Sequence, residues 1–207
     1  MPAPAIPVHS MAEASLYLML VRCEACSGSA MPTSAQAVDG QAGAVEDGSA
    51  LCVAVTCRAC GCERTVRFDL GRVDPAEAAG GLEGWAAMAQ VGQAPPVNRT
   101  DQPSQALDAA DWLALHTMLS ATARSKLEQA ASSADRIAAR KSQIQAGECI
   151  EEMLKLYDAD NELPPADAFF SQSNRNRFRE HPELFLRERL LSLRSRSARA
   201  RAHENGQ

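Results

Sequence analysis

Two pairs of closely spaced cysteines carry the clearest chemistry in this sequence. Cys23 and Cys26 stand in "CEAC", and Cys57 and Cys60 stand in "CRAC". A two-residue spacer lets both thiolates of a tight turn face one ion, and two such turns together form a tetrahedral site of four sulfur ligands. We therefore predict that these four cysteines bind one metal ion.

Three further cysteines are left out of the predicted site. Cys62 is an alternative to Cys60 as the fourth ligand, but a Cys57-x4-Cys62 spacing is looser and does not match the first pair. We interpret Cys52 and Cys62 as small apolar residues, and Cys149 as a buried residue of a helix.

Two other interpretations of the cysteine pairs were weighed. Core cysteines that share their spacing by chance are disfavoured, because both pairs stand at the ends of predicted strands. A redox-active CxxC motif requires a thioredoxin-like βαβ context. The sequence around the pairs does not have that pattern.

The segments that flank both pairs have strand-like patterns. "SLYLMLVR" precedes the first pair, "ALCVAVT" precedes the second and "ERTVRFDL" follows it. These apolar, β-branched or alternating runs predict strands, and the turn-rich residues 38–48 between them predict a loop. We expect a small antiparallel sheet within residues 15–72.

With two CxxC turns on a small sheet, residues 15–72 resemble a zinc ribbon. The resemblance implies a structural Zn²⁺ ion held by the four cysteines, which supplies folding free energy. Rubredoxins, iron proteins of one-electron transfer, are the main alternative, because tetrahedral sulfur ligation accepts either metal. Rubredoxins are densely aromatic around the iron, whereas residues 15–72 hold only Tyr17 and Phe68. Zinc is therefore favoured.

The remainder of the chain divides by composition. Residues 1–14 are a Pro/Ala-rich leader that we expect to be disordered, and residues 73–106 a Gly/Pro-rich irregular linker. Residues 107–202 have a helical pattern, and 203–207 form a tail. The predicted fold class is α+β: a zinc ribbon followed by an all-α domain.

Helix signals are strong from residue 107 onward. Asp108 is placed to cap a first helix, and Ser132-x-x-Asp135 is a capping-box pattern that starts a second. Four apolar residues form one stripe of the first helix: Trp112, Leu115, Leu119 and Ala123. Two such helices joined tightly form an antiparallel pair.

Charge is unevenly distributed along the chain. The net charge is -5, yet residues 175–201 hold nine arginines and three glutamates, a net +6, which leaves -11 for the rest. Such a basic end can contact nucleic acid or dock on the acidic body. The candidate phosphate contacts are Arg187, Arg189, Arg194, Arg196, Arg199 and Arg201.

Several function classes have no support in the sequence. No segment approaches the ~20 apolar residues of a membrane span, and the first residues lack a signal peptide, so we expect a cytoplasmic protein with reduced thiols. No nucleophile motif or phosphate loop is present, so neither an enzyme nor a small-molecule substrate is predicted. The preference for Arg over Lys suggests a bacterial source.

The predicted function is a non-enzymatic binding or adaptor protein with a structural zinc site of four cysteine ligands. Its expected partner is another protein. The two alternatives are a nucleic-acid-associated regulator that uses the Arg-rich end, and a rubredoxin-like iron electron carrier.

Overall fold

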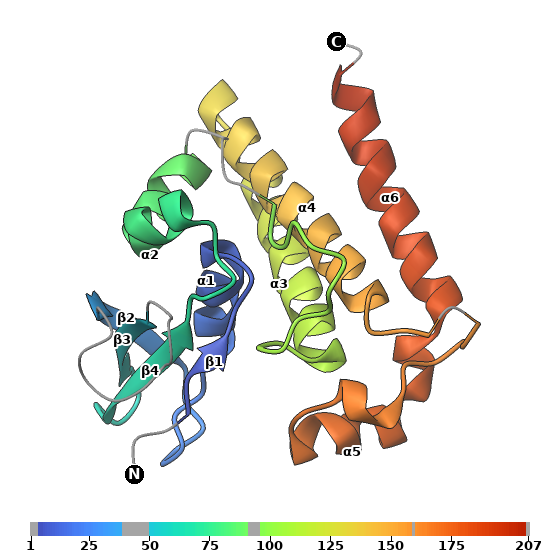
Figure 1. Ribbon diagram of the computed structural model, residues 1–207. Helices are drawn as coiled ribbons and strands as arrows, with labels where there is room; N and C mark the ends of the chain where they lie inside the picture. The colour runs from blue at the N-terminus through green and yellow to red at the C-terminus, as the bar shows by residue number, and fades with distance from the viewer. Residues whose placement is uncertain (1–3, 39–49, 91–95, 159, 206–207) are drawn as a thin grey trace. The chain divides into compact units, whose positions relative to one another are not determined.

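The chain divides into two units, residues 1–100 and 101–207, in the computed structural model. The structure describes residues 4–38, 50–90, 96–158 and 160–205, and the predicted loop lies almost entirely outside them. The fold is α+β, as predicted, with a four-stranded sheet and a packed helix pair (Figure 1). Among the described residues, no helix combines the length and the apolar character needed to cross a membrane.

The sheet of the first unit has the strand order β1-β4-β3-β2. The strands are β1 (Ile6–Pro7), β2 (Ala30–Val38), β3 (Ala50–Cys57) and β4 (Glu63–Asp69). β2, β3 and β4 form the expected antiparallel ladder, but β1 pairs with β4 in parallel, so the sheet is mixed.

Residues 4–14, which the sequence assigns to a disordered leader, include β1 and the start of α1. Val8 is fully buried, and its N–H donates to Asp69 O at 3.2 Å. Pro7 lacks an N–H, but an edge strand tolerates this because one side of the strand needs no partner.

"SLYLMLVR" is mostly helical rather than extended, which corrects a second prediction. Helix α1 spans Met11–Leu20, and the Ser10 side chain caps it by accepting from the Glu13 N–H. A short apolar run is compatible with helix or strand, and the Ser-x-x-Glu start signal decides for helix. Tyr17 of α1 meets Phe68 of β4 edge to face, with ring centroids 5.6 Å apart.

The predicted irregular linker contains helix α2 (Pro75–Gln90). Pro75 suits a first helical position, and Asp74 Oδ1 accepts from the Ala76 N–H at 2.9 Å. Gly81, with φ 57°, interrupts the helix with a kink, so the glycines bend the element instead of preventing it. Glu77 of α2 accepts from the Met11 N–H at 2.6 Å and so helps to cap α1.

The second unit is built on α3 (Ala109–Glu128) and α4 (Ser133–Leu154), which pack as a pair. Both predicted capping boxes are present, at Asp108 and at Ser132. The four residues of the predicted α3 stripe are buried.

The remaining elements of this unit are α5 (Gln172–Glu180), α6 (Arg187–Asn205) and two short 3-10 helices, η1 (Ala166–Ala168) and η2 (Pro182–Phe185). Phe169, Phe178 and Phe185 form an aromatic cluster among them. Tyr157 OH donates to Phe185 O at 2.6 Å and attaches this segment to the end of α4.

Asp108 connects α3 to α5. It is fully buried, and its Oδ2 accepts from the Phe170 N–H and from Asn174 Nδ2, at 2.8 and 2.9 Å. Asn174 also donates to Asp111 Oδ1 at 3.1 Å. Burial, together with the charge of Asp108, raises the pKa of Asp111 to about 6.

The raised pKa of Asp111 predicts a pH dependence of stability. Between about pH 4 and pH 6 the folded chain keeps a proton on Asp111 that the unfolded chain has lost, so this contribution to the free energy of unfolding declines as the pH rises through 6. Between pH 4 and pH 7 the free energy of unfolding should decrease less in Asp111→Asn than in the parent protein, by roughly 1 to 3 kcal/mol. Urea unfolding followed by helical circular dichroism measures it. The exposed Asp167→Asn is the control, and an unchanged pH profile in Asp111→Asn would contradict the assignment.

Candidate metal centre

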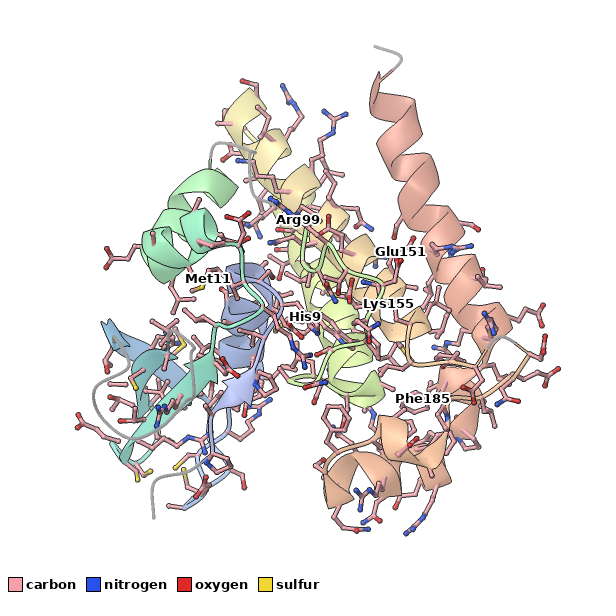
Figure 2. The ribbon with its side chains drawn as sticks, viewed as in Figure 1. His9, Met11, Arg99, Glu151, Lys155 and Phe185 are labelled. Carbon is pink, nitrogen blue, oxygen red and sulfur yellow. The ribbon has the colours of Figure 1, made fainter. Side chains whose placement is uncertain are left out.

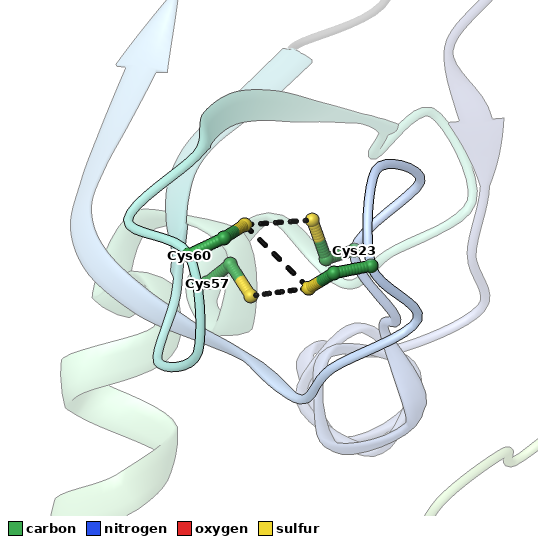
Figure 3. A group of neighbouring side chains, drawn as sticks. Cys23, Cys57 and Cys60 are labelled. Atoms are coloured by element: carbon green, nitrogen blue, oxygen red, sulfur yellow. Dashed lines mark hydrogen bonds between the residues drawn. The ribbon is translucent and has the colours of Figure 1, made fainter.

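The structure brings four of the seven cysteines together. The sulfur atoms of Cys23, Cys26, Cys57 and Cys60 all lie within 4.8 Å of one another. Three of the sulfur pairs are 3.5 Å apart, as the dashed lines in Figure 3 show. Sulfurs of a regular tetrahedron with Zn–S bonds of about 2.3 Å lie about 3.8 Å apart. The cluster therefore has the size that a metal ion with four sulfur ligands requires.

Strand pairing and one bridge hold the two turns side by side. The β2–β3 register places Ala30, just after the first turn, opposite Cys57. The Arg58 N–H donates to Ser29 O at 3.1 Å. Arg22 and Ser29 form an isolated antiparallel β-bridge through their backbones. Each pair of ligands is thus fixed at the end of a backbone ladder.

The two turns have the same backbone hydrogen bonds. In the first, the Cys23 N–H donates to Gly28 O at 2.8 Å and the Ser27 N–H donates to Cys23 O at 2.7 Å. In the second, the Cys57 N–H donates to Cys62 O and the Gly61 N–H to Cys57 O, both at 2.9 Å. The turns are therefore structurally equivalent cysteine knuckles.

The left-handed residue of each knuckle is the one that directly follows its second cysteine. Ser27 has φ 57° and Gly61 has φ 72°. A glycine such as Gly61 adopts this conformation without strain, but in the first knuckle Ser27 adopts it and Gly28 does not. Alignment of "CEACSG" with "CRACGC" would have revealed this, because Ser27 and Gly61 are then equivalent.

Gly28 is needed for a different reason, which is close packing. A Cβ at this position would lie 3.0 Å from Ala59 Cβ and 3.2 Å from the sulfurs of Cys26 and Cys57. The absence of a side chain at Gly28 lets one knuckle approach the sulfur atoms of the other.

Backbone N–H groups point at the sulfurs. The N–H groups of Cys60 and Ala59 donate to Cys57 and lower the pKa of its thiol to about 6. The Cys62 N–H has the same effect on Cys60, but the neighbouring thiols of Cys26, Cys23 and Cys57 outweigh it and raise the pKa of Cys60 to about 12.

The first knuckle repeats this pattern. N–H groups of Ala25 and Cys26 lower the pKa of Cys23. The Gly28 N–H lowers the pKa of Cys26, but the Cys57 thiol and other neighbours leave it raised overall. In both knuckles the first thiol is stabilised as a thiolate and the second is not. A bound cation removes this conflict because it stabilises all four thiolates.

The three other cysteines lie outside the cluster. Cys62 is exposed, so it does not behave as a buried apolar residue, and its sulfur is 3.9 Å from Glu63 O. Cys52 is half-buried on β3. Cys149 is buried in α4, and burial raises the pKa of its thiol. No second group of potential metal ligands occurs in the described part of the chain.

The arginines of the basic end belong to the second unit, whereas the cysteine cluster belongs to the first. Arg187 Nη1 donates to Asp158 O at 2.8 Å. Arg194 pairs at 3.6 Å with Glu151 of α4, which is labelled in Figure 2. These contacts hold α6 against its own unit. The side chains of Arg199 and Arg201 lie outside the described residues.

Comparison with protein-family models, with curated proteins and with solved structures finds no match for this chain. The candidate metal centre therefore rests on the spacing of the cysteines and on the geometry of the two knuckles.

The packing of Gly28 yields a prediction for the metal site. Gly28→Ala should weaken metal binding by about 10 to 100-fold, as is typical when the support around metal ligands is disturbed, because the new methyl group displaces two sulfurs. Chelator-competition titration measures the affinity. Ser27→Gly is the matched control, because it relieves a left-handed residue, worth roughly 1 kcal/mol, without adding atoms. Equal affinities of Gly28→Ala and the parent protein would contradict the packing argument.

Proposed function

We propose that Cys23, Cys26, Cys57 and Cys60 hold one Zn²⁺ ion and that the ion is structural. The observation that carries the proposal is the convergence of two equivalent knuckles on one tetrahedron-sized cluster of sulfurs. Four protein ligands saturate a tetrahedral zinc ion, whereas catalytic zinc sites keep a position open for water or substrate. When bound, the ion would crosslink the two strands at one end of the β2–β3 ladder, where Ala30 pairs with Cys57.

Zinc is preferred to iron on the surroundings of the site. Tetrahedral sulfur ligands accept both metals, so the donor set alone does not choose. The two aromatic residues of 15–72, Tyr17 and Phe68, contact each other across α1 and β4, as described above. They do not form the dense aromatic surroundings expected from the rubredoxin resemblance.

A closed structural site supports a protein that acts by binding, so we propose a non-enzymatic adaptor. The metal supplies no reactive position, and its role is to make a small sheet stable enough to present a surface. A reducing compartment such as the cytoplasm would keep the four thiols available as ligands.

Metal analysis tests the zinc proposal directly. Purified full-length protein should contain one zinc per chain and be colourless. Cys23→Ser/Cys57→Ser should lose the metal and unfold residues 16–72 while the helices of residues 101–207 remain, because metal binding contributes on the order of 10 kcal/mol in small zinc modules. Elemental analysis and amide NMR spectra report both effects.

The matched control for this variant is Cys52→Ser/Cys62→Ser, which changes two cysteines outside the cluster. It should keep full zinc content. Red protein whose visible absorption is bleached by dithionite would overturn the zinc assignment in favour of iron. Retention of metal by Cys23→Ser/Cys57→Ser would show that the ligand set is wrong.

The adaptor role is tested by partner capture. The full chain and its Cys23→Ser/Cys57→Ser variant, each with the same affinity tag, are recovered from cells of the native source. We expect at least one protein to be enriched with the parent chain and reduced at least tenfold with the variant, measured by quantitative mass spectrometry. If the two chains recover the same proteins in the same amounts, the metal-held unit does not act as a binding surface.

A further inference from the structure

A cavity of about 540 Å³ is lined by residues of α3, α4 and α6, which all belong to the second unit. Its volume falls in the range of small-molecule sites, roughly 300 to 1,000 Å³. A smaller hollow of about 310 Å³ continues along α3 and α6 and shares His116, Ser120, Arg124 and Leu193 with it.

The charge of the cavity has a single sign. Four arginines line it, from three different helices: Arg124, Arg136, Arg140 and Arg196. The described residues that line the cavity include no aspartate or glutamate. Arg189 extends the same charge into the smaller hollow. Arginine side chains offer paired N–H donors that match the geometry of carboxylate and phosphate oxygens.

Three of these four arginines have no acidic side chain within ion-pair distance among the described residues. No ion pair within the described residues involves Arg124, Arg136 or Arg196. Arg196 Nε makes one long hydrogen bond, 3.5 Å, to Ser192 O of its own helix. An anion in the cavity would therefore gain contacts without displacing an internal carboxylate from these three arginines.

The rest of the lining is largely apolar. Ala123 and Ala139 are buried on its walls, and Leu193 contributes from α6. Leu127, which also lines the cavity, leaves 60% of its surface exposed, an unusual fraction for a large apolar side chain. A ligand with an apolar body would cover part of this surface.

His116 provides a fixed polar group on the same wall. It is largely buried, and its Nδ1 lies 2.9 Å from Ala146 O, so Nδ1 carries the proton and donates. This hydrogen bond joins α3 to α4 and holds the ring in one orientation where it lines the cavity.

We propose that this cavity binds a small amphipathic anion, with a carboxylate or phosphate group among the arginines and an apolar body against the alanine and leucine side chains. A hydrophobic lining with a few convergent cationic groups is the usual chemistry of such sites. Nucleic acid fits less well, because the lining includes no phenylalanine, tyrosine or tryptophan on which a base could stack. The site is independent of the proposed zinc function, since its residues all belong to the second unit.

The test uses the full-length protein and calorimetric titration with four probes below their micelle concentrations. Decanoate and decyl phosphate are the anions, monodecanoylglycerol is the neutral chain and decyltrimethylammonium is the cation. We expect both anions to bind at least tenfold more tightly than the neutral and cationic chains. The tighter of the two anions identifies the head group as carboxylate or phosphate.

Paired substitutions locate the binding. Arg124→Gln/Arg196→Gln should weaken binding of the preferred anion by roughly 10 to 100-fold, the range for loss of hydrogen bonds to charged groups. The control Arg177→Gln/Arg179→Gln removes the same charge from exposed positions of α5 and should change it less than twofold. Equal effects of the two pairs would mean that only net charge matters, which overturns the site.

A second variant keeps the test decisive if the arginine pair does not fold. Ser120 is half-buried and lines both hollows, so the indole of Ser120→Trp should occupy their space and abolish anion binding. Ser125→Trp, at an exposed position of α3, should leave anion binding unchanged. Binding of the neutral chain as tightly as the anions, absence of binding up to millimolar concentrations, or preference for a single-stranded oligonucleotide over both anions would each overturn the proposal.

Discussion

Four thiol groups within 4.8 Å of one another are the constraint on which the first unit depends. Thiolates at this distance repel, and backbone N–H groups of both knuckles are turned toward them rather than toward carbonyl oxygens of the sheet. Four thiolates together are favourable only when a cation lies among the sulfurs. Metal binding and folding of this sheet are therefore expected to be one coupled process.

The cluster itself was predictable because its information is local. A two-residue spacer determines how two cysteines of one turn face an ion, and strand-like segments next to each pair bring the turns together. The residues that hold the ligands in place were harder to predict from the sequence. Gly28 is required by close packing and not by a left-handed turn, because Ala59 and Cys57, which approach it, belong to the other knuckle and are distant in sequence.

The same distinction between local and distant information separates correct from incorrect fold predictions. The capping boxes at Asp108 and Ser132 lie within four residues of sequence, and the structure contains both. β1 forms only by parallel pairing with β4, about sixty residues later in the chain. The sequence of the leader alone therefore does not predict this strand. The contacts of Asp108 with Phe170 and Asn174 join segments more than sixty residues apart in the same way.

The arginines of the second unit show most clearly that packing brings together charges that are far apart in the sequence. Along the chain, positive charge is concentrated after residue 175, which points to a basic tail as the place of any anion contact. In the folded unit, Arg187 and Arg194 of that tail are engaged by α4 and the segment after it. Arg196 instead shares a cavity with arginines of α3 and α4, which lie more than fifty residues earlier in the chain. Anion recognition is then a property of three packed helices, and it depends on α6 remaining docked, since without α6 the cavity loses one wall and one of its cations.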